Sequence, residues 1–235
     1  EHFRAPFRAQ LGEFGAFVPF PAGDGSFSAK GFRAVLEKQF RRAAIGAVLV
    51  EPIQARAGTR VPPTWFLPLL REVCDAHGAL LMLDEIYTGF GRTGRWFAIE
   101  SSGVAPDIVT CGKGMAGGYM PVGAVLTTNH IVDTVNAAGG FRHGFTFSHN
   151  PTTAAACLAT LDILEQEQLV ERAAVMGERL FEVLRPLLAH PHVGDIRGRG
   201  LMAGIERQAD GRDRATGAEI KRDVDALGRI HKDAL

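Results

Sequence analysis

Short apolar runs alternate with amphipathic segments along the first half of the chain. Phe32, Leu36 and Phe40 recur at helical spacing behind Ser28, which predicts a helix capped by that serine and running to about residue 42. Because strands alternate with helices, the pattern predicts an α/β domain built on a mostly parallel sheet flanked by helices. Four apolar runs have the length of buried strands, namely 45–50, 80–83, 107–111 and 122–127.

Prolines and a glycine bound the second predicted helix. Pro62 and Pro63 predict its start, since proline is tolerated in a first helical turn. His77 is the predicted last residue, because Gly78 can adopt the left-handed conformation that ends many helices. The strand at 80–83 then follows directly.

The last third of the chain predicts a second, smaller unit. Residues 152–188 have a helical pattern that predicts two helices, broken near 167–169 and bent at Pro186. Residues 193–197 and 201–206 predict an antiparallel pair joined by a glycine-rich turn. We therefore divide the chain into a large α/β domain at 1–165 and part of a small α+β domain at 166–235.

Composition narrows the class of protein. The chain has 235 residues, enough for a full core, and its 26 basic residues balance 26 acidic residues. That balance indicates neither nucleic acid nor a membrane surface as a partner, and no apolar run has the length of a membrane-spanning helix. Cys74, Cys111 and Cys157 are scattered in apolar contexts, which is typical of a reducing compartment and predicts a cytoplasmic protein.

Two charged residues follow predicted strands. Asp84 comes directly after the run at 80–83, and Lys113 follows the run at 107–111 through a single glycine. In α/β enzymes, ligands bind at the carboxyl ends of parallel strands, so both side chains are candidates for one site. An acid that holds a pyridinium nitrogen and a lysine that forms a Schiff base are what pyridoxal phosphate requires of a protein.

Each of these residues also has a plainer interpretation. A lysine between two glycines is usually solvated, although here the strand before it predicts that Lys113 is buried. Of the acids Asp84 and Glu85, one could cap the next turn while the other faces water. A carboxylate straight after four apolar residues is stable when buried only if a positive group meets it, which favours a ligand.

Four further features of the sequence are candidates for binding. The glycines of 89–94 are spaced as in a dinucleotide-binding loop, but they do not directly follow a strand or open a helix, so we reject that interpretation. His143 and His149 lack the carboxylate or cysteine that would complete a metal site. Thr146 could bond a phosphate oxygen, and Arg197 could bind a carboxylate through both nitrogens or simply lie at the surface.

Taken together, several ordered motifs resemble the class III pyridoxal-phosphate-dependent aminotransferases. The most specific is the run from Leu83 to Gly94, LDEIYTGFGRTG, followed by Pro106-Asp107-Ile108-Val109 and Gly112-Lys113. Residues 50–54, Thr146 with Asn150-Pro151, and the segment 196–201 fall in the family's order. The resemblance implies the large domain of a fold-type-I transferase with pyridoxal 5'-phosphate as cofactor.

The resemblance also implies roles for single residues. Lys113 would form the Schiff base with the cofactor and then act as the base that moves a proton. Asp84 would pair with the pyridine nitrogen and Ile86 would pack on the ring. Thr146 would reach the phosphate bound by the neighbouring subunit, which predicts a homodimer with the active site at the interface. Arg197 would take a substrate carboxylate.

Three departures from the family pattern alter those expectations. Tyr87 stands where many members carry a glutamine that bonds the ring's phenolic oxygen. Arg56 stands where ornithine and 4-aminobutyrate enzymes carry an acid, so we expect Glu51 and Arg56 to line a substrate site that disfavours ornithine-type donors. The family's phosphate-binding loop has no counterpart before Glu51, which predicts an N-terminally truncated chain that binds cofactor poorly by itself.

The function that the resemblance implies is a transfer of an amino group from an amino acid or ω-amine donor to a 2-oxo acid, in two ping-pong steps. The same lysine and acid would also serve an amino-acid racemase, an aminomutase or a decarboxylase of this family. A nicotinamide-dependent oxidoreductase and an inactive truncated fragment are the remaining alternatives.

Overall fold

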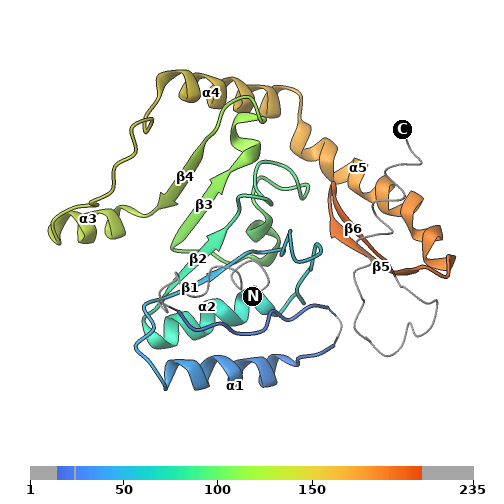
Figure 1. Cartoon of the computed structure of the whole chain (residues 1–235), viewed down its shortest axis with the longest axis horizontal. Helices are drawn as coiled ribbons and strands as arrows, with labels where there is room; N and C mark the ends of the chain where they lie inside the picture. The colour runs from blue at the N-terminus through green and yellow to red at the C-terminus, as the bar shows by residue number, and fades with distance from the viewer. Residues whose placement is uncertain (1–14, 24, 208–235) are drawn as a thin grey trace.

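A four-stranded mixed sheet is the centre of the molecule, which is a computed structural model that describes residues 15–23 and 25–207 (Figure 1). The strand order is β1-β2-β3-β4. The first three strands are parallel and β4 is antiparallel to β3, which confirms the mostly parallel sheet. The strands are β1 (Ala47–Val50), β2 (Leu80–Asp84), β3 (Ile108–Gly112) and β4 (Gly123–Thr127).

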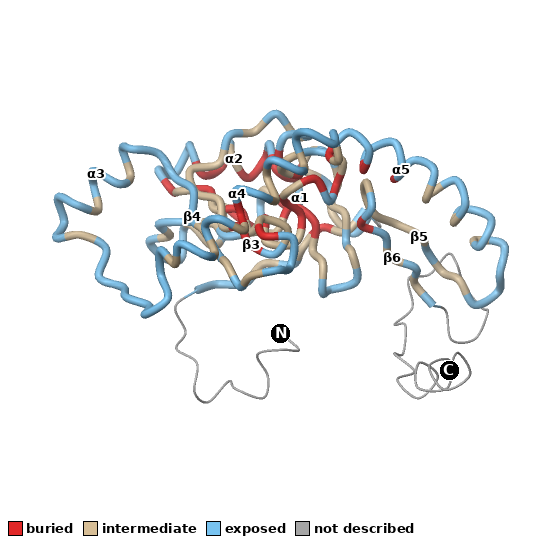
Figure 2. Tube along the Cα trace, turned by 90° about the horizontal axis from the view of Figure 1, so that it is seen from above, coloured by how far each residue is buried: buried red, intermediate tan, exposed pale blue. Residues whose placement is uncertain are grey.

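Two helices bury the main core against the sheet. Helix α2 (Phe66–His77) packs on β1 and β2, and α1 (Ala29–Phe40) packs on α2. Phe32 of α1 is fully buried, with its ring centroid 5.4 Å from that of Phe66. The buried residues concentrate in this layer (Figure 2). Ser28 caps α1 as predicted, because its hydroxyl accepts the N–H of Gly31.

The predicted start of the second helix was wrong. Residues 61–63 are not helical, and α2 begins only at Phe66, whose N–H donates to the carbonyl of Pro63. The reason is steric, since a residue that precedes proline is pushed toward extended backbone, and Pro62 precedes Pro63. The predicted end is confirmed, because Gly78 follows His77 with a φ of 63°.

The rest of the described chain contains three α-helices and a hairpin. The break between α4 and α5 lies at Gln168, whose φ is 49°, and Pro186 lies in the short 3-10 segment η4 (Arg185–Ala189). Helix α3 was not predicted and has no buried residue. The elements are α3 (Asn129–Ala137), α4 (Pro151–Gln166), α5 (Leu169–Leu184), β5 (Val193–Arg199) and β6 (Met202–Arg207).

The hairpin of β5 and β6 is antiparallel, as predicted, and lies beside α5 at the opposite end of the molecule from α3 (Figure 1). The division of the chain at residue 165 stays a prediction, and residues 1–14 and 208–235 of the two predicted domains lie outside the described residues. Within the described part of the chain, no helix has the length and apolar character needed to cross a membrane.

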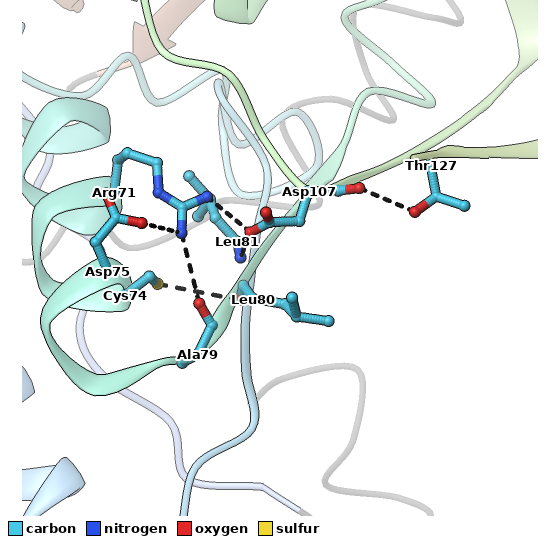
Figure 3. A network of polar contacts seen from close by, with 8 residues as sticks. All are labelled: Arg71, Cys74, Asp75, Ala79, Leu80, Leu81, Asp107 and Thr127. Atoms are coloured by element: carbon cyan, nitrogen blue, oxygen red, sulfur yellow. Dashed lines mark hydrogen bonds and ion pairs between the residues drawn. The ribbon is translucent and has the colours of Figure 1, made fainter. Parts of the chain in front are cut away.

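An arginine and an aspartate join α2 to the start of β2 and β3 and to the end of β4 (Figure 3). Arg71 donates to Asp107 over 2.7 Å and pairs with Asp75 over 2.7 Å. The same Asp107 oxygen accepts the N–H of Leu81 over 2.7 Å, while the Asp107 carbonyl accepts the hydroxyl of Thr127. Burial alone would raise the pKa of Asp107, but the bonds from Arg71 and Leu81 outweigh burial and hold that pKa below its usual value.

We expect Asp107→Asn to lower the free energy of unfolding by about 1.5–3 kcal/mol at neutral pH, because a charge-assisted bond to Arg71 is lost. A carboxyl whose pKa is lowered on folding stabilises the protein above its unfolded pKa of about 4, and this stabilisation is lost as pH falls through the lowered value. The wild type should therefore lose stability across that acidic window, and the variant should lose less. Urea unfolding followed by circular dichroism at successive pH values measures both.

Asp75→Asn is the matched control, since Asp75 pairs with the same arginine from an exposed position. Its expected cost is at most about 0.5–1 kcal/mol. Equal losses for Asp75→Asn and Asp107→Asn would contradict the role given to Asp107.

Candidate functional site

Three acidic or basic side chains follow neighbouring strands of the sheet. Glu51 comes directly after β1, Asp84 is the last residue of β2, and Lys113 comes directly after β3. Because β1, β2 and β3 are parallel neighbours, their carboxyl ends lie along one edge of the sheet. The parallel register thus places the two residues predicted from the apolar runs, Asp84 and Lys113, on adjacent strand ends.

Asp84 is half-buried and its orientation is fixed locally. Its Oδ1 accepts the N–H of Ile86 over 3.0 Å. In the register of β2 and β3, Asp84 pairs with Thr110, whose carbonyl accepts the N–H of Glu85 over 2.8 Å. The Ile86 N–H therefore holds the carboxylate, and the Glu85 N–H ties the adjoining backbone to β3.

Lys113 leaves the sheet immediately after the last residue of β3. Its backbone has a φ of 40°, in the left-handed region, and it starts the short 3-10 segment η3 (Lys113–Ala116). The amino group lies 3.8 Å from the centroid of the Tyr87 ring, a distance at which an ammonium is attracted to the ring face. The expectation that Lys113 is buried was wrong, because the residue lies beyond the final ladder pair, Gly112 with Gly123, and its side chain is exposed.

Glu51 is half-buried beside these two residues. Its carboxylate accepts the N–H of Ala55 over 3.1 Å, which starts the turn that follows β1. Burial raises the pKa of the Glu51 carboxyl and the negative charge of Asp84 adds to the rise, whereas the Ala55 N–H and the positive charge of Lys113 oppose it. The charges of Asp84 and Lys113, at the two neighbouring strand ends, therefore both act on the Glu51 carboxyl.

Glu85 is a site feature that the sequence interpretation missed. Instead of facing water, its side chain is fully buried. The carboxylate accepts the Thr88 hydroxyl and the N–H groups of Ala98 and Ile99, at 3.1 and 2.9 Å. These two N–H groups open the 3-10 segment η2 (Ala98–Ser102). Burial raises the pKa of Glu85, although these three donors lower it in part.

The glycines of the loop at 89–94 are used for close packing. A methyl group on Gly94 would lie 2.8 Å from the Cα of Ala174 in α5, and one on Gly91 would lie 3.2 Å from Val170. A methyl group on Gly200, in the turn between β5 and β6, would overlap the backbone of Thr93. These approaches explain why the loop is glycine-rich without any bound dinucleotide.

Arg197 already binds carboxylates of this chain. It pairs with Asp195 over 2.8 Å and with Glu206, and its Nε donates to the carbonyl of Gly58 over 2.9 Å. These bonds join the hairpin to the turn that follows Glu51. The role of Arg197 in holding a substrate carboxylate stays a prediction, and any such substrate would compete with two acidic side chains.

The remaining predicted residues lie around this edge or apart from it. Ile86 and Tyr87 are half-buried and follow Asp84 directly, and Arg56 is exposed on the turn after Glu51. Thr146 is in the loop between α3 and α4, where residues 141–149 are all exposed (Figure 1). Within this chain, Thr146 therefore belongs to an outlying arm and not to the edge that carries Lys113.

Comparison with known proteins identifies a family. A profile described as aminotransferase class-III matches residues 20–229. The taurine–pyruvate aminotransferase of Bilophila wadsworthia is 44% identical over 168 residues, which are 69% of this chain and 37% of that protein. Ornithine aminotransferase 1 of Staphylococcus aureus is 44% identical over 164 residues, which are 70% of this chain and 41% of that protein. The chain thus spans well under half the length of these curated relatives.

Solved structures give the same assignment. An (S)-enantioselective ω-transaminase from Thermomicrobium roseum superposes with a TM-score of 0.75 at 38% identity, covering 86% of this chain and 49% of that one. An amine transaminase from an uncultivated Pseudomonas species, in its pyridoxal-phosphate-bound form, gives 0.74 at 42% identity, covering 79% and 44%. The predicted fold class, the large domain of a fold-type-I transferase, is confirmed by these likenesses.

The packing of the glycine loop on α5 predicts how much a methyl group at Gly94 destabilises the protein. Gly94→Ala should lower the free energy of unfolding by about 2–4 kcal/mol. Overpacking of the added methyl group against α5 costs about 1–3 kcal/mol, and holding an alanine in left-handed backbone costs about 1 kcal/mol more. Gly103→Ala is the matched control, because Gly103 has a similar φ, 67° against 80°, but no atom within 4 Å of the added methyl. Its expected cost is only the strain of about 1 kcal/mol. Chemical unfolding measures both, and equal costs would show that the loop does not pack on α5.

Proposed function

The chain belongs to the class-III aminotransferases, and from this premise we propose that the protein moves an amino group from an amino acid or ω-amine donor to a 2-oxo acid, in two ping-pong steps on pyridoxal 5'-phosphate. The observation that carries the proposal is the pairing of an amine and a carboxylate on adjacent parallel strand ends, Lys113 after β3 and Asp84 at the end of β2. This edge is where α/β proteins bind their ligands.

The donor set at the edge fits the cofactor chemically. When bound, pyridoxal phosphate supplies an electron sink that stabilises negative charge at the substrate carbon. Asp84 would hold the protonated ring nitrogen through the oxygen not engaged by the N–H of Ile86. Ile86 and Tyr87 would contact the ring, and Lys113 would attach the cofactor and carry a proton to and from the reacting carbon.

Tyr87 has a further task in this arrangement. Its ring face holds the Lys113 amino group at 3.8 Å, so the amine stays near the strand end although the lysine side chain is exposed. Lysine has a long, flexible stem, and such a contact limits the positions that its amine visits. Tyr87 would therefore keep the charged lysine near the strand end before it attaches the cofactor.

Two kinds of alternative reaction are less well supported. A racemase, aminomutase or decarboxylase would rely on the same lysine and acid, but each relative named above is an aminotransferase or a transaminase. Formation of one equivalent of oxo acid per amine consumed separates transfer from these reactions. A nicotinamide-dependent oxidoreductase is not favoured, because Gly91 and Gly94 are occupied with packing on α5.

The turn after Glu51 supports a donor with an acidic tail. Arg56 places a positive charge on this turn. The residue before it, Ala55, donates its N–H to the Glu51 carboxylate. A cationic tail such as that of ornithine would meet repulsion there, whereas a carboxylate or sulfonate would be attracted. The second substrate would be a small 2-oxo acid, as the name of the taurine–pyruvate relative suggests.

The proposal includes a homodimer in the cytoplasm. Exposed aromatic side chains gather on the arm that holds Thr146, with Phe141 80%, Phe145 63% and Phe147 68% exposed. Apolar area of this kind is typical of an interface, and it supports an arrangement in which Thr146 reaches the phosphate site of the partner.

The three cysteines are buried free thiols, which supports a reducing compartment.

Chemical trapping tests the site. The intact protein, incubated with pyridoxal phosphate and reduced with borohydride, should carry the label on Lys113 in peptide mass spectra. Lys113→Ala should lose both the label and the visible absorption of the bound cofactor, whereas Lys38→Ala, an exposed change on α1, should keep both. A label on another lysine, or an absorption band that persists unchanged in Lys113→Ala, would refute the proposed chemistry.

Sedimentation tests the dimer. Phe145→Lys should weaken self-association at least ~10-fold, the change that about 1.4 kcal/mol produces, because it removes apolar area and places a charge in an apolar contact. Val175→Lys is the control, since Val175 is also 70% exposed but lies on α5. A monomeric wild type, or equal weakening by both changes, would be evidence against an interface at the 141–147 arm.

A further inference from the structure

We propose that Glu85 is the positioning residue of the active site, which holds Asp84 and Ile86 toward the cofactor by anchoring the peptide between them. The inference rests on the proposed function, because it concerns how the same site is aligned. Glu85 itself touches neither cofactor nor substrate in this role. It acts through its two neighbours in the chain.

The alternation of side chains at the end of β2 supports this role. Glu85 is fully buried, while Asp84 and Ile86 on either side of it are only half-buried. Successive side chains of an extended segment point to opposite faces. Because Glu85 points into the interior, Asp84, the last residue of β2, is left on the opposite face, toward the open edge where Lys113 lies, and Ile86 follows in the turn after the strand.

The N–H, the carbonyl and the carboxylate of Glu85 are all hydrogen-bonded, and their partners lie in β3, at residues 88–89 and in η2. Its N–H donates to the carbonyl of Thr110 in β3, and its carbonyl accepts the N–H of Gly89, both over 2.8 Å. The carboxylate accepts from Thr88, Ala98 and Ile99. One residue thus joins the ends of β2 and β3 to the glycine loop and to η2.

The peptide bond between Glu85 and Ile86 transmits this anchoring. The N–H of Ile86 belongs to that peptide, and it is the donor that holds Asp84 Oδ1 over 3.0 Å. A peptide unit is planar, so rotation of the Glu85 backbone would redirect this N–H. Loss of the Glu85 anchor would therefore release the carboxylate that is to hold the ring nitrogen.

The chemistry of the anchor requires an acceptor-only side chain. Three donors converge on the carboxylate, and within residues 15–23 and 25–207 no ion pair involves it. A glutamine has the same size but replaces one acceptor oxygen with an NH₂ donor. That donor would oppose the N–H of Ile99 or of Ala98, leaving a buried group without a partner. Glu85→Gln is therefore a nearly isosteric test.

The test compares Glu85→Gln with Glu100→Gln. Glu100 also accepts an N–H at the start of η2, that of Phe97 over 2.8 Å, but it is exposed and has no link to Asp84. For intact protein titrated with pyridoxal phosphate, we expect the dissociation constant of Glu85→Gln to rise at least ~10-fold and its visible absorption maximum to shift. Glu100→Gln should change the dissociation constant less than about twofold and leave the spectrum unchanged.

Hydrogen exchange of the cofactor-free protein provides an independent measurement. In Glu85→Gln, peptides covering 84–99 should exchange faster than in the wild type, while those of α1 should not change. Thr88→Val removes one of the three donors and keeps the side-chain shape, so it should give the same shifts with a smaller rise, about threefold. It serves as the test if Glu85→Gln does not fold.

The outcomes separate the two proposals. If the wild type binds pyridoxal phosphate and the Glu85 or Thr88 variants bind it equally well with the same spectrum, Glu85 is only part of the scaffold and this inference is wrong. If the wild type binds no cofactor, the proposed function fails and the inference fails with it. Weaker binding with an altered spectrum in the Glu85 and Thr88 variants, against an unchanged Glu100→Gln, supports the inference.

Discussion

The alignment of β2 with β3 controls whether this site exists at all. Asp107 sets that alignment at the start of β3, because its N–H donates to the carbonyl of Leu81 and its side chain accepts the Leu81 N–H. Arg71 holds the aspartate from α2. The pairing that results places Asp84 opposite Thr110, three residues before the lysine. Side chains alternate with a period of two, so a slip by one residue would turn one of the two groups to the wrong face.

Much of this arrangement could be predicted from the amino-acid sequence because it depends on local patterns. Short apolar runs indicated the strands, and Ser28 and Gly78 marked the start of one helix and the end of another correctly. The order of strands and helices favoured parallel pairing, and parallel pairing brings strand ends together. Asp84 and Lys113 could therefore be assigned to one edge from the amino-acid sequence alone.

What could not be predicted depends on contacts between residues distant in the chain. Burial of Glu85 requires the N–H groups of Ala98 and Ile99, which η2 supplies thirteen and fourteen residues later. The exposure of Lys113 depends on where the pairing with β4 stops. Helix α3 was not predicted, and none of its residues is buried by the described part of the chain. The pairing of Arg197 with Glu206 follows only from the hairpin register.

The glycine contacts around Thr93 have a mechanical consequence. Gly177 of α5 meets the backbone of Gly200, and Gly200 in turn meets the backbone of Thr93, so main chain rests on main chain with no side chain between. Side chains can absorb a displacement by changing rotamer, but peptide units cannot. A shift of the β5–β6 hairpin would therefore displace the backbone of the glycine loop at Thr93. This loop follows the end of β2, so it couples the hairpin to Asp84 and Ile86, the residues proposed to contact the cofactor.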